Sequence, residues 1–399
     1  MNNIFAFGII IFLGFLGAYL LSRLKVPAVT GYIIIGLLLG VSFLNIISPE
    51  VEARFNWLIN LALLMIAFSV GGELKRKELA KMGRFIAWIV VFETIFAFLF
   101  ILGAILLAGL DYKAAIIVAA LGSATAPAAT VLVLNELRAK GPLTSTLLAC
   151  VGIDDAMGIT IYSIASSVVQ ALLSKGGFHM GMVIFSIIFD LAVSIVVGIL
   201  AGIVLIYLGK RVKYDTQAVI FTLGTLFFFT GPLYNTWHHY HFSPLLAAMV
   251  TGFVFVNYSS HSRRIFRNLE FFAYPFYLVY FVLAGAKLQI RYFFKLGIVA
   301  IAYLVGRFIG KNAGVFLGGI FGKAPRNVRK YAGLGLFSQA GIAIGLALFA
   351  ANRFPMYSNT IIAIALGTTI ITETLGPILT KIAVTRSGEA GEKSKTGGV

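Results

Sequence analysis

Long apolar runs, separated by short polar segments, repeat from one end of the chain to the other. Most of the runs are long enough to cross the ~30 Å hydrocarbon core of a bilayer as a helix. The pattern predicts about thirteen transmembrane helices and therefore an all-α membrane protein. The runs lie at 4–21, 28–46, 56–72, 85–109, 114–135, 143–173, 181–208, 216–231, 243–259, 268–290, 295–321, 330–352 and 357–380.

Positive charge gathers in the segments that follow the odd-numbered runs. Most of the 32 Lys and Arg residues lie there or in the tail, for example at 75–84, 210–213 and 323–330. Because basic loops stay on the cytoplasmic side, we predict an outside N-terminus and a cytoplasmic C-terminus in a bacterial-type inner membrane. The segment 386–399 is rich in Gly, Ser and charge and is expected to be a disordered cytoplasmic tail.

The composition narrows the functional classes. Of the 399 residues, 59% are hydrophobic and 12% are charged, whereas soluble domains are ~25% charged. Topology and anionic lipid account for the net charge of +17, so the bilayer and not nucleic acid is the expected partner. The sequence contains no nucleophile elbow, phosphate loop or metalloprotease motif, so we expect neither an enzyme nor a bound cofactor.

The odd number of runs suggests two similar halves joined by a linker helix. The run at 181–208 is the best candidate for the linker, because it lies mid-chain and contains few polar residues apart from Asp190. The six runs on either side would then form two inverted repeats, as in many secondary transporters.

Two adjacent carboxylates, Asp154 and Asp155, lie inside the run at 143–173. They are about twelve residues from its predicted cytoplasmic end, which places them roughly 18 Å into the membrane and near its midplane. Carboxylates at this depth are costly, so the pair is predicted to be the functional centre. Since helix neighbours point ~100° apart, we expect one to face a water-filled cavity and the other a buried cation. Close carboxylates also suit a site where protons compete with a metal cation.

Pro127 lies in the middle of the run at 114–135, close to Thr125 and Thr130. Proline lacks a backbone N–H and its ring obstructs the preceding turn, so a helix break is expected there. A break would present carbonyls and the Thr125 and Thr130 hydroxyls, which suit Na⁺. A simple proline kink is the alternative.

The run at 330–352 contains Ser338 and Gln339 among several glycines. This pattern is typical of a second broken helix, which would face the break at Pro127. Small residues also allow plain close packing of helices, and the sequence does not separate these two interpretations.

Two basic residues, Arg307 and Lys311, lie inside the run at 295–321. Arg307 is about twelve residues from the extracellular end, again near the midplane. A buried arginine needs a carboxylate, so Asp154 or Asp155 is its expected partner. Lys311 is one turn closer to the cytoplasm on the same face and is a further charge-compensating residue, unless it only lines a cavity.

Other titratable residues carry weaker signals. Glu73 and Glu93 are placed near the cytoplasmic ends of their runs, where we expect them to pair with the basic loop at 75–84. Glu373, in the last run, is either functional or faces a cavity. Three histidines follow the eighth run and are interpreted as an extracellular loop in preference to a metal or pH-sensing site: His238, His239 and His241.

At these residues the sequence resembles the bacterial sodium/proton antiporters of the cation:proton antiporter superfamily, over nearly all of residues 1–385. The Asp-Asp element is the most specific feature, since the related Kef-type potassium-efflux proteins usually carry Gln-Asp there. The matching segments are VPAVTGYIIIGLLLG at 26–40, AFSVGGELKRKEL at 67–79, SATAPAATVLVLNEL at 123–137, VGIDDAMGI at 151–159, SPLLAAMVTGFVF at 243–255 and LVGRFIGKNAG at 304–314.

The resemblance implies a homodimer built from two inverted repeats with crossed broken helices. Residues 1–84 and 216–291 would form the dimerisation domain, and residues 85–174 and 295–385 the core transport domain. Residues 181–213 would form the linker helix. Alternating access would come from movement of the core against the fixed dimer.

The resemblance also implies separate roles for the two carboxylates. Asp155 would be the main ion- and proton-binding group, while Asp154 would pair with Arg307. Many electrogenic relatives carry lysine where Arg307 is placed. Because arginine does not release its proton, the number of protons exchanged stays open.

We expect an antiporter that exchanges Na⁺, or else Li⁺ or K⁺, for H⁺, with Asp154 and Asp155 as the ligands of the transported metal cation. Three alternatives stay open. They are a gated potassium-efflux system or K⁺/H⁺ exchanger, a sodium-coupled symporter of organic anions, and a membrane sensor that transports nothing.

Overall fold

The protein is all-helical in its computed structural model, which describes residues 2–22, 28–77, 83–173, 180–209, 211–212, 214–234, 242–259, 261–339 and 341–391. Within these residues no strand is found. The predicted histidine loop, with His238, His239 and His241, lies outside the described residues.

The helices follow the predicted apolar runs. The first half contains α1 (Asn3–Ser22), α2 (Ala28–Leu39), α3 (Pro49–Arg54), α4 (Asn56–Glu73), α6 (Arg84–Leu107), α7 (Tyr112–Leu121), α8 (Pro127–Glu136) and α9 (Pro142–Leu173). The middle of the chain forms α10 (Met180–Gly209). The second half contains α11 (Asp215–Thr230), η1 (Gly231–Tyr234), α12 (Pro244–Tyr258), α13 (Ser262–Lys287), α14 (Ile290–Lys295), α15 (Gly297–Phe321), α16 (Arg326–Gly335), α17 (Gly341–Arg353), η2 (Pro355–Tyr357) and α18 (Ser358–Ser387).

The membrane-spanning pattern agrees with the sequence. In the part of the chain that the structure describes, nine helices are long and apolar enough to cross a bilayer. Four shorter apolar helices, α2, α7, α12 and α17, occupy the four remaining predicted runs. Every predicted run therefore contains an apolar helix, although α2 ends at Leu39 and not near residue 46.

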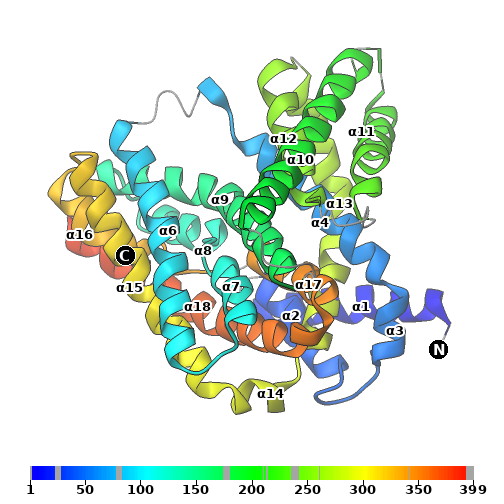
Figure 1. Ribbon diagram of the computed structural model, residues 1–399, viewed down its shortest axis with the longest axis horizontal. Helices are drawn as coiled ribbons and strands as arrows, with labels where there is room; N and C mark the ends of the chain where they lie inside the picture. The colour runs from blue at the N-terminus through cyan, green and yellow to red at the C-terminus, as the bar shows by residue number, and fades with distance from the viewer. Residues whose placement is uncertain are drawn as a thin grey trace, which may run out of the picture.

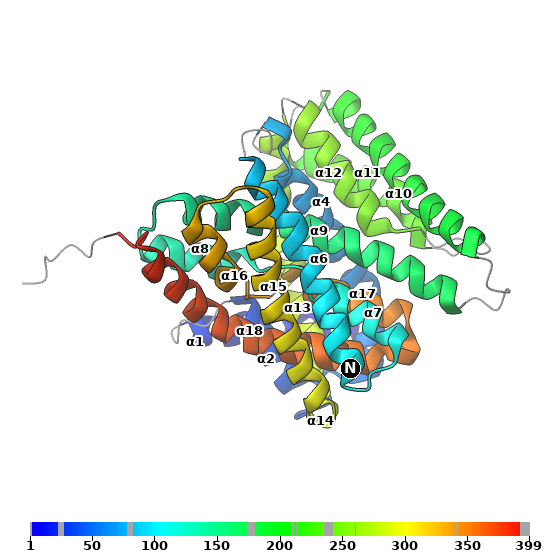
Figure 2. The same ribbon diagram turned by 60° about the vertical axis from the view of Figure 1, so that its left-hand side comes forward.

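The helices pack in two groups (Figures 1 and 2). We call the first group, α6–α9 with α15–α18, the first bundle, and the second group, α1, α2, α4 and α11–α13, the second bundle. Helix α10 packs on α12 and α11 and also contacts α9, so it touches both bundles. The grouping follows the predicted division at residues 1–84, 85–174, 216–291 and 295–385, whose roles in dimerisation and transport stay predictions.

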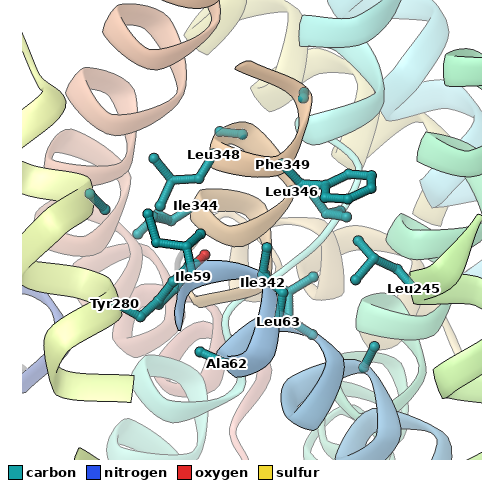
Figure 3. Close-up of a cluster of buried hydrophobic side chains, with 14 of the residues drawn as sticks. Ile59, Ala62, Leu63, Leu245, Tyr280, Ile342, Ile344, Leu346, Leu348 and Phe349 are labelled. Atoms are coloured by element: carbon teal, nitrogen blue, oxygen red, sulfur yellow. The ribbon is translucent and has the colours of Figure 1, made fainter. Parts of the chain in front are cut away.

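Helix α17 of the first bundle packs against α4 of the second bundle (Figure 3). Its side chains Ile342, Ile344 and Leu346 are buried, with Ile59 and Leu63 of α4 in the same apolar cluster. Burial of apolar side chains is non-directional, so this contact holds the bundles together without fixing one hydrogen-bonded register.

Helices α6 and α15 lie side by side along much of their length (Figures 1 and 2). Four glycines of α15, spaced four residues apart, face the α6 backbone so closely that a Cβ on any of them would meet α6 main-chain atoms. They are Gly306, Gly310, Gly314 and Gly318. A stripe of small residues lets membrane helices approach closely. This close packing fixes the position of α6 along α15, so charged side chains on the two helices are brought together at defined positions.

The chain end is ordered further than expected. Helix α18 continues to Ser387, and Glu389 is buried against the start of α9. The Glu389 carboxylate accepts hydrogen bonds from the Leu143 N–H at 2.7 Å and from the Thr144 N–H and hydroxyl at 2.8 Å. The prediction of a disordered tail from residue 386 is therefore wrong for its first residues. The N–H groups in the first turn of α9 have no acceptor within their own helix, and Glu389 supplies one, which holds this part of the tail in place.

Candidate functional site

Two helices of the first bundle are interrupted where they meet. Helix α7 ends at Leu121 and α8 begins at Pro127, while α16 ends at Gly335 and α17 begins at Gly341. Proline is suited to the first position of α8, because that N–H would have no partner within the helix. The two interruptions, 122–126 and 336–339, are called the crossing below.

The two halves of the crossing satisfy each other's polar groups. The Ala126 N–H donates to the Ser338 carbonyl at 3.0 Å, and the Thr130 hydroxyl donates to the Gly335 carbonyl at 2.9 Å. The Thr125 hydroxyl donates to the Leu336 carbonyl at 3.3 Å. In a membrane interior unpaired backbone groups are costly, so these bonds explain how both helices can break. The crossed, broken helices predicted at Pro127 and at Ser338 are present, and simple kinks are excluded.

Gln339 forms hydrogen bonds with residues of α7 and α15 next to the crossing. Its amide N–H donates to the Leu121 carbonyl at 3.1 Å, and its carbonyl oxygen accepts from the Tyr303 hydroxyl at 2.8 Å. Gln339 and Ser338 have no exposed surface. Both residues therefore belong to the crossing as predicted, with Gln339 linking α7 to α15.

Arg307 binds backbone carbonyls, and the predicted pairing of Arg307 with Asp154 is wrong. Its Nε donates to the Phe337 carbonyl at 3.1 Å, and its Nη2 donates to the carbonyls of Ala124 at 2.8 Å and Ser338 at 3.0 Å. Its Nη1 donates to the Gly122 carbonyl. The guanidinium thus spans both sides of the crossing, where helix C-terminal ends concentrate partial negative charge. These carbonyls replace the carboxylate that the sequence interpretation required.

Lys311, one turn further along α15, is the basic partner of Asp154. Its Nζ lies 3.2 Å from Asp154 Oδ2 and donates to the Ser123 carbonyl at 2.7 Å. It also forms an ion pair with the Glu93 carboxylate. The side chains of all three charged residues are completely buried. The buried lysine therefore compensates charge directly, as expected of it, and does not merely line a cavity.

Glu93 is the residue of this site that sequence reasoning missed. It was expected to pair with the basic loop at 75–84, but it binds Lys311 instead. Its Oε1 lies 2.8 Å from the Thr94 hydroxyl, which also lies within hydrogen-bond distance of the Val90 carbonyl. The position of Glu93 in the sequence could have indicated this role. It is nine residues past the start of α6, or roughly 13 Å into the span, which is too deep for a residue of the loop at 75–84 to be its natural partner.

Asp154 and Asp155 have different surroundings. Asp154 is completely buried, and its Oδ1 has no hydrogen-bond partner in the described part of the chain. Asp155 is partly exposed and has no hydrogen bond or ion pair to another described residue. The one-residue step on α9 therefore turns one carboxylate toward the lysine and leaves the other without a partner among the described residues.

Glu373 also lies in the interior. Its carboxylate accepts a 2.5 Å hydrogen bond from the Thr30 hydroxyl of α2, and both residues are buried. Glu73, at the end of α4, is exposed and forms no ion pair with Lys311, although it lies near enough to Asp155 for the two charges to interact. Neither residue joins Lys311, so the group around the crossing is limited to α6, α9 and α15 among the described charged residues.

Comparisons with known proteins identify this arrangement. The family described as "Sodium/hydrogen exchanger, transmembrane" matches residues 8–386. A solved structure of the sodium proton antiporter MjNhaP1 from Methanocaldococcus jannaschii at pH 8 is similar, with a TM-score of 0.80 and 20% identity, over 98% of this chain and 99% of that one. At this identity the likeness shows the fold. A search of curated proteins found no match. With nearly its whole length matched, the chain belongs to the sodium/hydrogen exchanger family.

Proposed function

We propose that this protein exchanges a monovalent cation, Na⁺ in the first place, for H⁺, and that Asp155 is the group that binds both. Membership of the sodium/hydrogen exchanger family supports the exchange reaction. The observation that carries the assignment to Asp155 is its isolation: it is the partly exposed carboxylate beside Asp154, without a protein partner among the described residues. A carboxylate in this position must take up a proton or a cation.

The two ligands compete for one site. The ionised Asp155 carboxylate binds the cation with help from nearby oxygen atoms, and the unpaired Oδ1 of Asp154 is the nearest buried candidate on the same helix. The Thr125 and Thr130 hydroxyls already donate to carbonyls across the crossing, so they would contribute only their oxygen lone pairs. Protonation of Asp155 displaces the cation, and exchange therefore weakens at low pH.

The two bundles supply the movement that alternating access requires. We assign the dimer scaffold to residues 1–84 and 216–291 and the moving core to residues 85–174 and 295–385, linked by 181–213. The apolar contact of α17 with α4 supports this division (Figure 3), because such a surface can slide at low cost. The charge pattern of the loops supports a plasma-membrane protein with its N-terminus outside and its C-terminus in the cytoplasm. The homodimer is proposed from the resemblance to the sodium/proton antiporters alone.

Flux measurements in proteoliposomes test the proposal. A pH gradient should drive uptake of Na⁺, and parallel assays with Li⁺ and K⁺ give the preference among cations. Asp155→Asn should abolish cation-coupled proton flux while the protein stays monodisperse. Asp215→Asn is the matched control, because Asp215 is exposed on α11 and its ion pair with Arg264 lies at the surface. Exchange by the Asp155→Asn variant at the normal rate would exclude Asp155 as the shared site.

A further inference from the structure

A groove lies where α10 packs against α12, next to α9 (Figures 1 and 2). The two helices approach closely, because a Cβ on Gly198 or Gly202 of α10 would meet the side chain of Val250 or of Val254, respectively. Beside this contact the groove has a volume of about 920 Å³. Sites for small molecules have volumes of roughly 300–1,000 Å³, so the groove is large enough to hold a ligand.

The two long walls of the groove are apolar. Helix α10 contributes a stripe of isoleucines, Ile195, Ile199 and Ile203, which share one face because they are four residues apart. Each of them is 39–40% exposed, so protein atoms cover only part of these side chains. Helix α12 contributes Val250 and Val254 on the other side. A ligand of this groove must therefore be apolar along its length.

The helix that carries Asp155 also reaches the groove, through Thr160. The Thr160 hydroxyl donates to the Ala156 carbonyl of its own helix at 2.8 Å, so its donor is already used. The groove thus lies at the boundary between α9 of the first bundle, α12 of the second bundle and α10, which touches both.

The length of the groove matches a lipid chain. Its lining residues on α10 extend from Leu191 to Tyr207, sixteen residues further along the helix. This distance corresponds to roughly 24 Å of helix, whereas one leaflet of the hydrocarbon core is about 15 Å thick. An acyl chain that enters at the Tyr207 end can therefore lie in the groove over its whole length.

The Tyr207 end of the groove is aromatic and basic. Tyr207 and Tyr258 line the groove and are exposed. Arg211 follows Tyr207 by four residues and Arg263 follows Tyr258 by five, and both arginines are exposed. Tyrosines gather at the interface between membrane and water, and basic residues beside this interface attract anionic lipid. This end therefore suits a negatively charged headgroup.

We propose that the groove binds one acyl chain of an anionic phospholipid, whose phosphate is held by Arg211 and Arg263. Inside a bilayer the chain gains contacts on several sides in the groove, which it cannot gain on a convex helix surface. The two arginines supply the preference for negative charge, because the acidic residue nearby, Asp215, is paired with Arg264. This binding site is separate from the exchange reaction proposed above and does not depend on it.

Native mass spectrometry of the purified full-length protein tests the headgroup. Phosphatidylglycerol and phosphatidylcholine with identical acyl chains are added in turn. Each arginine at a membrane surface contributes about fivefold, so the pair predicts roughly a thirtyfold preference for phosphatidylglycerol at one site per chain. Equal retention of the two lipids would overturn the proposal.

A photoactivatable phosphatidylglycerol, with a diazirine on its acyl chain, tests the place of binding without any variant. Peptides from 191–207 and 246–258 should carry most of the label. Labelling that is spread evenly over α1, α10 and α12 would contradict a site in the groove.

Two pairs of variants separate the chain from the headgroup. Ile199→Trp fills the groove and should lower retention of both lipids roughly tenfold, whereas Leu200→Trp, at an exposed position outside the groove lining, is the matched control. Equal retention by these two variants, or dissociation of a dimer by Ile199→Trp, would show that no lipid chain occupies the groove.

The second pair changes charge and leaves the groove intact, so it stays informative if Ile199→Trp does not fold. The double variant Arg211→Gln, Arg263→Gln should retain both lipids equally. The double variant Lys323→Gln, Arg326→Gln removes the same charge from exposed residues near the start of α16 and should keep the full preference. An unchanged preference in the first double variant would rule out the two arginines as the headgroup site.

Discussion

The hydroxyl of Thr30 donates a 2.5 Å hydrogen bond to the carboxylate of Glu373, and this bond joins the two bundles of the protein. Thr30 belongs to α2 of the second bundle, and Glu373 belongs to α18 of the first. Both side chains are buried. Movement of one bundle against the other at this level must therefore break the bond and leave an acid without its donor.

Removal of the Thr30 hydroxyl should destabilise this conformation. Thr30→Val keeps the shape of the side chain but leaves the Glu373 carboxylate without its donor, which should cost about 1–3 kcal/mol. Thr30→Ser retains the donor and is the matched control. Melting temperatures in detergent compare the two variants with the parent protein. Equal melting of the Val and Ser variants would show that the bond contributes nothing.

The glycine stripe of α15 should not tolerate a side chain. In Gly314→Ala the new Cβ would meet the backbone of Glu93, and overpacking of this kind should cost about 1–3 kcal/mol. Gly103→Ala on α6 is the control, because nothing lies within 4 Å of its Cβ position. Since alanine favours helix over glycine, the control should be neutral or up to about 1 kcal/mol more stable. Thermal unfolding measures both, and an unaffected Gly314→Ala protein would contradict the packing described.

Arg307→Lys should loosen the crossing although the charge is kept. Lysine has three donors on one nitrogen and cannot reach the carbonyls of Gly122, Ala124, Phe337 and Ser338 together, as the guanidinium does. Each buried carbonyl left unpaired should cost about 1–3 kcal/mol. Amide hydrogen exchange should accelerate within 122–126 and 336–339. Arg326→Lys, at the exposed start of α16, is the control and should leave exchange there unchanged.

Glu52 gives a prediction about pH. It forms a 2.6 Å ion pair with Lys287, yet burial outweighs the lysine and raises the pKa of Glu52 above its ordinary value of 4.5. The folded protein therefore binds the proton more tightly than the unfolded chain does. The contribution of Glu52 to stability is then largest below pH 4.5 and decreases as the pH rises through the raised pKa.

The Glu52→Gln variant tests the sign of this effect. The melting temperature of the parent protein, relative to that of Glu52→Gln, should fall between acidic and neutral pH. A relative melting temperature that rises over this interval would mean that the attraction to Lys287 exceeds the effect of burial.

The positions of the helices could be predicted from the sequence, because each membrane-spanning helix requires a long apolar run. The two helix breaks could be predicted as well, because each requires residues that interrupt a helix. Pro127 marks the first helical residue after one break, and Ser338 lies within the other. Which buried basic residue pairs with Asp154 could not be predicted from the sequence. Arg307 and Lys311 differ by one turn on one face, and depth alone made Arg307 the natural partner of Asp154. The glycines of α15 decide the matter, since they bring α6 close enough for Glu93 to reach Lys311.

The buried Glu389 also couples two helices that are far apart in the sequence. The Leu143 and Thr144 N–H groups lie at the start of α9, the helix that carries Asp154 and Asp155, and their acceptor follows the end of α18. The first turn of α9 therefore gains these acceptors only once a segment more than 240 residues later has been synthesised and packed beside it.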